Sequence, residues 1–284
     1  MTIVCTACML ALLAFSDTAM TAALTAARCF ASGVMPALFP MMVLGRMLPA
    51  AARNGRSSAA VWMHTGAFAF ASGSPASAQR AEEVRAGISP RAWEKLLCLT
   101  GVMSPMFFTG TLAGCLGSPK DGWILLGIHW LGAAVTALVW PACRKEALPH
   151  EGRDMPKRAS LPEAIARSAH SLLCVCGAMM VFSVAASLVK SVLSALFPVW
   201  TAQHAGWLAV FWGMMEIGGG SSAVIQAYQK PHALLSALCG FGGLSIWLQN
   251  LLFLENSIRP AKLLLMRAVH GAVCYALVRI LNPF

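Results

Sequence analysis

Residues 211–250 read FWGMMEIGGGSSAVIQAYQKPHALLSALCGFGGLSIWLQN and contain two apolar segments with glycines at their middle. The interruptions are GGGS at 218–221 and GFGG at 240–243. Because glycine permits backbone conformations that end or kink a helix, each segment is predicted to be a helix broken near its centre. Within a bilayer, such a break is tolerated only where protein or a water-filled cavity satisfies the freed backbone groups. The two breaks therefore predict a polar interior.

The composition assigns the chain to a membrane. Its 284 residues are 58% hydrophobic and 11% charged, against roughly 25% charged in an ordinary soluble domain. Segments 123–142 and 263–281 are uninterrupted and long enough to cross a bilayer. The net charge of +10 comes from basic residues scattered in short hydrophilic gaps without an aromatic-studded basic face. The lipid bilayer is therefore the expected partner, and nucleic acid is not.

The first half of the chain contains two corresponding breaks, SGSP at 72–75 and GVMSP at 101–105. Four pairs of residues match across the halves at offsets close to 142, half of 284. The pairs are Arg28 with Arg167 (139 residues), Gly73 with Gly218 (145), Gly101 with Gly240 (139) and His129 with His270 (141). This spacing predicts an internal duplication.

The predicted organisation has four parts: an N-terminal membrane helix at 1–16, a first repeat at 17–142, a cytoplasmic linker at 143–160 and a second repeat at 161–284. For the first part, a cleaved signal peptide is the alternative. If the first broken segment of each repeat is a re-entrant hairpin and the second crosses the membrane, each repeat crosses three times, and the second copy is inverted.

The distribution of charge supports two inverted repeats, because this topology places most basic residues on the same side of the membrane. That side is predicted to be cytoplasmic. They lie at 53, 56, 80–95, 144–160, 259 and 262. The predicted fold class is therefore an all-α, multi-pass protein of the cytoplasmic membrane. It has two inverted repeats, each with a re-entrant hairpin and a discontinuous transmembrane helix, as in many secondary transporters.

Three buried titratable residues are candidates for coupling transport to H+ or Na+. Glu216 is the only acid inside a long apolar segment, so it is expected to be protonated, paired or bound to a cation. A structural pair with Arg267 is the alternative. His129 and His270 are candidate proton relays, with a hydrogen bond between helices as the alternative. Arg46 and Arg267 lie near span ends and are expected to extend toward the surface.

The polar and small residues at the breaks are the candidate substrate-binding residues, because the N-terminus of a half-helix presents unpaired N–H groups to an anion. The alternative is that the glycines only let helices pack closely. Gln249 and its neighbour Asn250 either line a pore or satisfy backbone groups. The other candidates are Ser72, Gly73, Ser74, Pro75, Ser77, Gln79, Gly101, Ser104, Pro105, Glu216, Gly218, Gly219, Ser221, Ser222, Gly242, Gly243 and Ser245.

Enzymatic chemistry is not expected. The sequence lacks the HExxH, GxSxG and Walker A motifs in their usual contexts. Most of the ten cysteines lie in apolar runs and are expected to pack as small hydrophobic residues. No metal site and no cofactor are predicted.

The run ASGSPASAQRAEEVRAGISPRAWEKLLCLTGVMSPMFFTGTLAG at 71–114 resembles the YlbJ-type sporulation integral membrane proteins, whose pattern is approximately GYPxGAK followed by RLLxFxNNSGPxFxxG. GMMEIGGGSS at 213–222 and CGFGGLSIWLQN at 239–250 are similar to that family's ExTxG and GFGGLSxxxQ segments. The resemblance implies a nucleoside-recognition, or Gate, domain, with dipicolinate as cargo, and it favours Gln249 over Asn250. The sequence departs from the pattern at Ser74, at Gln79 and at 101–103, where the family has Tyr, Lys and Asn-Asn-Ser.

These features predict a secondary carrier or facilitator for a small polar or anionic molecule. A nucleoside-type carrier and a non-transporting membrane scaffold or assembly subunit are the alternatives. A homo-oligomer is compatible with the sequence.

Overall fold

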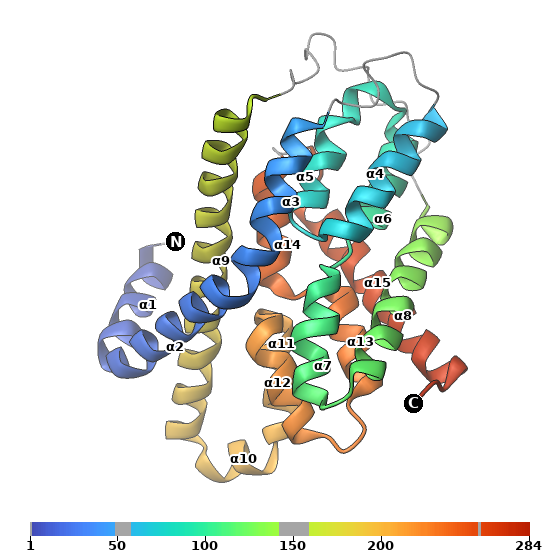
Figure 1. Ribbon diagram of the computed structural model, residues 1–284. Helices are drawn as coiled ribbons and strands as arrows, with labels where there is room; N and C mark the ends of the chain where they lie inside the picture. Colours follow the sequence, from blue (N-terminus) through green and yellow to red (C-terminus); the bar gives the residue numbers. More distant parts are fainter. Residues whose placement is uncertain (1, 49–57, 142–158, 255–256) are drawn as a thin grey trace.

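The computed structural model describes residues 2–48, 58–141, 159–254 and 257–284. Every regular element within these residues is helical, and none of them forms a strand, which confirms the predicted all-α class (Figure 1). Nearly all of the predicted linker at 143–160 lies outside the described residues.

The N-terminal part is a kinked helical run that packs on one long helix. The 13 residues of α1 (Thr2–Ala14) are fewer than the roughly 20 needed for a span. Next come α2 (Ser16–Cys29), a π-helical turn (Phe30–Val34) and α3 (Met35–Met47). Both α2 and α3 pack against α9 (Leu161–Leu196).

The same order of elements follows in each half of the chain: a broken pair, a second broken pair and an uninterrupted helix. In the first half these are α4 (Ser58–Ser72) with α5 (Ala76–Glu83), α6 (Pro90–Thr100) with a π-helical stretch (Phe107–Leu112) and α7 (Ala113–Leu116), and α8 (Pro119–Val139). In the second half, after α9 and the short α10 (Pro198–Gln203), they are α11 (Ala205–Met215) with α12 (Ile217–Ala227), α13 (His232–Phe241) with α14 (Gly243–Phe253), and α15 (Pro260–Leu281).

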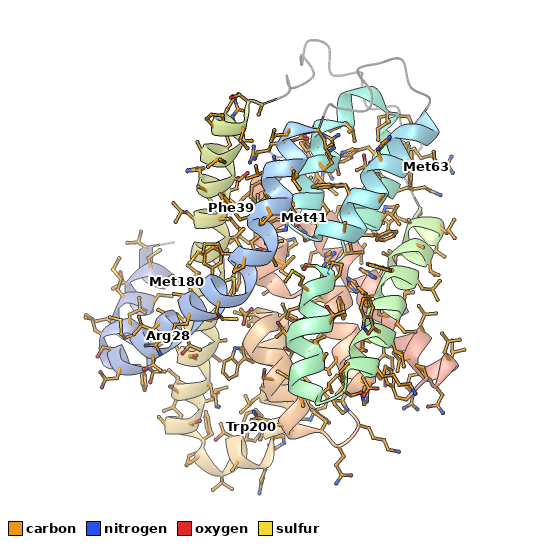
Figure 2. All side chains as sticks on the ribbon, viewed as in Figure 1. Arg28, Phe39, Met41, Met63, Met180 and Trp200 are labelled. Carbon is orange, nitrogen blue, oxygen red and sulfur yellow. The ribbon has the colours of Figure 1, made fainter. Side chains whose placement is uncertain are left out.

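Within the described residues, five helical stretches are long and apolar enough to cross a membrane: Ser16–Met47, Pro119–Val139, Leu161–Leu196, His232–Phe253 and Pro260–Leu281. Large apolar side chains such as Met63 and Trp200 are exposed on the outer surface (Figure 2). Exposed apolar surface on this scale suits contact with lipid better than contact with water. The membrane class predicted from composition is therefore compatible with the structure.

Helix breaks occur in all four predicted segments, but one lies at other residues than predicted. The turn between α11 and α12 is at Glu216, and the predicted break at 218–221 lies inside α12. The Glu216 side chain accepts hydrogen bonds from backbone N–H groups of the first turn, so the helix begins before the glycines. The break between α13 and α14 lies within the predicted 240–243, with the turn at Gly242, whose φ of 82° suits glycine.

The charged groups at the two ends of the molecule form separate clusters. At one end, Lys262 pairs with Glu94, and Arg85 donates to Ser257 Oγ at 2.5 Å. At the other end, His232 Nε2 lies 3.2 Å from an Asp121 oxygen. The α4–α5 hairpin lies toward the first end and the α11–α12 hairpin toward the second (Figure 1).

Gly240→Ala is expected to destabilise the packing of α13 on α15, because a Cβ there would lie 2.7 Å from Gly271 Cα. Overpacking of this kind costs about 1–3 kcal/mol. The matched control is Gly127→Ala on α8, where no atom lies within 4 Å of the added Cβ, so it should be neutral or slightly stabilising. Thermal unfolding of the detergent-solubilised protein measures both effects, and equal melting temperatures for the two variants would contradict the packing.

Candidate functional site

In the first half, the α4–α5 hairpin is joined to the break that follows α6. Ser74 N donates to Val102 O at 2.7 Å, and Ser77 Oγ donates to Thr100 O at 2.7 Å. Gly73 has a φ of 71°, and a Cβ on it would overlap the backbone of Ser104. Glycine is therefore required both for the turn and for the close approach. The hairpin satisfies backbone carbonyls that the break leaves free.

The second half repeats this relation. A Cβ on Gly243 would lie 3.3 Å from Gly213 O and 3.4 Å from Ile217 N. The break between α13 and α14 thus packs against the turn of the α11–α12 hairpin. In each half, the broken hairpin contacts the broken helix that follows it.

Glu216 lies at the N-terminus of α12 and is 6% exposed. Its Oε1 accepts from Gly218 N at 2.7 Å, and its Oε2 accepts from Gly219 N at 2.8 Å. A carboxylate at this position satisfies two free donors and complements the positive end of the helix dipole. The alternative pair with Arg267 is not formed, since both terminal nitrogens of that arginine lack partners within the described residues.

His129 and His270 connect a helix break to the two uninterrupted helices, α8 and α15. Met103 N donates to His129 Nε2 at 2.9 Å, and His270 Nε2 lies 3.1 Å from His129 O. The ring centroids are 4.7 Å apart. Hydrogen bonding between helices, the alternative to a proton relay, is thus observed for this pair.

These histidines and Cys274 have potential ligand atoms within 4.8 Å of one another, a composition that suits a transition metal. The hydrogen bonds argue against such a site. His129 Nε2 already accepts from Met103 N–H, so Nδ1 of the neutral imidazole carries the proton. In this arrangement His129 has no free lone pair for a metal ion.

Arg267 is 2% exposed, so the expectation that it extends to the surface is wrong. Its Nε donates to Phe241 O, the last carbonyl of α13, at 3.1 Å. Its Nη1 and Nη2 are buried without a hydrogen-bond partner among the described residues. The guanidinium lies beside both Gly101 and Gly242, where a Cβ would overlap it. Arg267 therefore lies between a break from each half of the chain.

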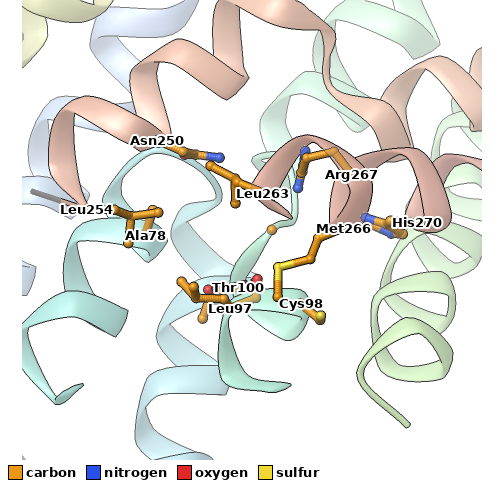
Figure 3. Close-up of a pocket in the computed structure, with 11 residues that line it drawn as sticks. Ala78, Leu97, Cys98, Thr100, Asn250, Leu254, Leu263, Met266, Arg267 and His270 are labelled. Atoms are coloured by element: carbon orange, nitrogen blue, oxygen red, sulfur yellow. Dashed lines mark hydrogen bonds between the residues drawn. The ribbon is translucent and has the colours of Figure 1, made fainter. Parts of the chain in front are cut away.

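A small cavity of about 10 Å³, here called the central cavity, adjoins Arg267 (Figure 3). Its lining includes Thr100, Gly101, Asn250 and His270. Of the predicted binding and coupling residues, Gly101 and His270 line this cavity. Sequence reasoning missed Arg267 as a site residue, although an arginine three positions before a histidine in an apolar helix was an available signal.

Asn250, rather than Gln249, lines the central cavity. Gln249 Nε2 donates to Ser245 Oγ at 3.1 Å, within α14. Asn250 Oδ1 is buried and has no hydrogen-bond partner within the described part of the chain. Successive residues of a helix point about 100° apart, and in α14 Asn250 is the one of these two neighbours that lines the cavity.

Arg46 and Gln79 belong to a second polar cluster, away from the central cavity. Arg46 Nη2 donates to Ser171 Oγ at 2.8 Å and to Gln79 Oε1 at 3.2 Å. Gln79 Nε2 donates to Glu83 Oε1 at 3.1 Å. Arg46 is half-buried, and its side chain joins α3, α5 and α9.

The other predicted residues lie at the breaks or in the helices beside them, and they do not line the central cavity. Ser72 and Ser221 donate to carbonyls of their own helices, at 2.7 Å from Phe68 O and 2.9 Å from Gly218 O. Ser222 Oγ lies 3.4 Å from Cys115 Sγ and so joins α12 to α7. Pro75 is buried, and Ser104 and Pro105 are half-buried.

Comparison of the chain with protein-family models, curated proteins and solved structures found no match. The structure itself gives the class: within the described residues, the chain is all-helical and has five apolar helices long enough to cross a membrane. The YlbJ-type resemblance stays a prediction.

Glu216→Ala is expected to destabilise the protein by about 0.5–2 kcal/mol, the usual cost of losing an N-cap, and Glu216→Gln by less because it keeps one acceptor oxygen. The control is Glu163→Ala, which removes an exposed ion pair with Arg167 worth about 0–1 kcal/mol. Denaturant unfolding in detergent measures the stability of all three variants. A Glu216→Ala variant as stable as the wild type would exclude the capping role.

Proposed function

We propose that the chain is a secondary carrier or facilitator for a small polar or anionic molecule in the cytoplasmic membrane. The observation that carries this proposal is the convergence of breaks from both halves on Arg267, a buried cation with two nitrogens that have no hydrogen-bond partner among the described residues. Polar groups of this kind inside apolar helices are costly and typical of solute pathways.

The inverted-repeat architecture is part of this proposal. Each half has the same order of broken and uninterrupted helices, and the two hairpins lie toward opposite ends of the molecule (Figure 1). This is the relation expected of re-entrant hairpins in repeats of opposite orientation. The end that contains Glu94 and Lys262 would then face the cytoplasm, by the excess of basic residues in that part of the sequence.

Coupling to H+ or Na+ is proposed to act through Glu216, with His129 and His270 as further candidates. The carboxylate of Glu216 occupies the N–H groups of Gly218 and Gly219. Neutralisation of the carboxylate by a cation weakens these charge-assisted hydrogen bonds. The N-terminus of α12 then becomes available to an anionic group of the cargo.

The YlbJ-type resemblance makes dipicolinate the first cargo to test and nucleosides the second. A membrane scaffold or assembly subunit is the alternative function. It is favoured by one observation: the central cavity, of about 10 Å³, has room for about one water molecule. In a carrier, this closed arrangement would be one of two alternating states.

Uptake into proteoliposomes tests the proposal. The purified full chain is expected to give saturable uptake of dipicolinate, which an imposed inward H+ or Na+ gradient accelerates. Glu216→Gln is expected to lose the acceleration, whereas Glu163→Gln, on the exposed surface of α9, is expected to retain it. Absence of saturable flux for both dipicolinate and uridine would contradict the carrier and favour the scaffold.

A further inference from the structure

Arg267 places a positive charge in the interior, and no acidic side chain of the described residues pairs with it. Among the described residues, the ion pairs are Arg80 with Glu83, Arg85 with Glu82, Arg167 with Glu163, His232 with Asp121 and Lys262 with Glu94. None of them includes Arg267. A charge that is removed from water is stable only where other groups compensate it.

The protein provides part of that compensation through helix ends. Arg267 Nε donates to Phe241 O at the end of α13, and Gly101, at the end of α6, lies beside Nη1. The C-terminal ends of helices carry partial negative charge. These contacts fix the guanidinium but leave Nη1 and Nη2 without acceptors within the described residues.

Two further features favour an anion at those nitrogens. The helix α14 begins at Gly243, next to the guanidinium, and no side chain caps its first turn, so its positive end adds to the charge of Arg267. The central cavity adjoins the same guanidinium (Figure 3) and has a volume of about 10 Å³, enough for a group about the size of one water molecule.

We propose that the central cavity binds one small monovalent anion of halide size on Nη1 and Nη2 of Arg267. A single anionic charge matches the single cation. Two kinds of anion supply a single negative charge: a halide ion from solution and the carboxylate of an organic molecule. The volume of the cavity favours the halide. This anion site does not depend on the chain being a carrier, so its test does not require flux.

The test is thermal unfolding of the full chain in detergent, with chloride replacing gluconate at constant ionic strength. The wild type is expected to show a saturable rise in melting temperature with chloride and with bromide. Arg267→Gln is expected to raise the half-saturating concentration by roughly tenfold or more, since it removes charge-assisted hydrogen bonds. The control Arg279→Gln removes the same charge from an exposed position on α15 and should leave the response unchanged.

Two outcomes would overturn the site: no anion dependence in the wild type, or the same dependence in Arg267→Gln. Saturable stabilisation by acetate or dipicolinate but not by chloride would overturn the halide assignment and indicate a carboxylate site. If Arg267→Gln does not fold, crystals of the wild type grown in bromide provide the second measurement. Anomalous scattering is then expected within hydrogen-bond distance of Nη1 or Nη2, and its absence there would exclude the site.

Discussion

The structure depends on one constraint, which is that backbone groups freed at each helix break must find partners inside the protein. Each break meets this constraint with a group from another element or with its own side chain. Val102 O accepts from Ser74 N, Met103 N donates to His129, and Glu216 accepts from the first turn of α12. Because lipid offers no hydrogen bonds, breaks without such partners would be too costly to keep.

This requirement explains why the uninterrupted helices α8 and α15 contain buried polar residues beside the breaks. His129 lies on α8, and His270 and Arg267 lie on α15. The two helices pack against each other and hold these side chains at the breaks of their neighbours. In the proposed carrier, the polar groups that stabilise the breaks would also form the interior that accepts the solute. The fold and the proposed transport thus rest on the same contacts.

Much of the fold was predictable from sequence, because glycine, proline and apolar length act locally. The breaks, α8 and α15 follow from such signals. The start of α12 was misplaced, since the capping by Glu216 depends on a side chain rather than on the glycines that follow it. The burial of Arg267 was not predictable from its position along α15, because a long side chain can turn inward or outward. The choice between Gln249 and Asn250 likewise depends on helix orientation, which the sequence does not contain.

If the breaks form a polar region that water reaches during function, cysteines introduced there will be accessible to water-soluble reagents in native membranes. Ser104 lies at a break and is half-buried, whereas Thr136 is fully buried within the intact α8. A small water-soluble methanethiosulfonate, followed by mass mapping of the labelled peptides, reports the two sites separately. Ser104→Cys is expected to be modified and Thr136→Cys to be protected. Protection of both would show a dry interior and contradict a polar region that water reaches.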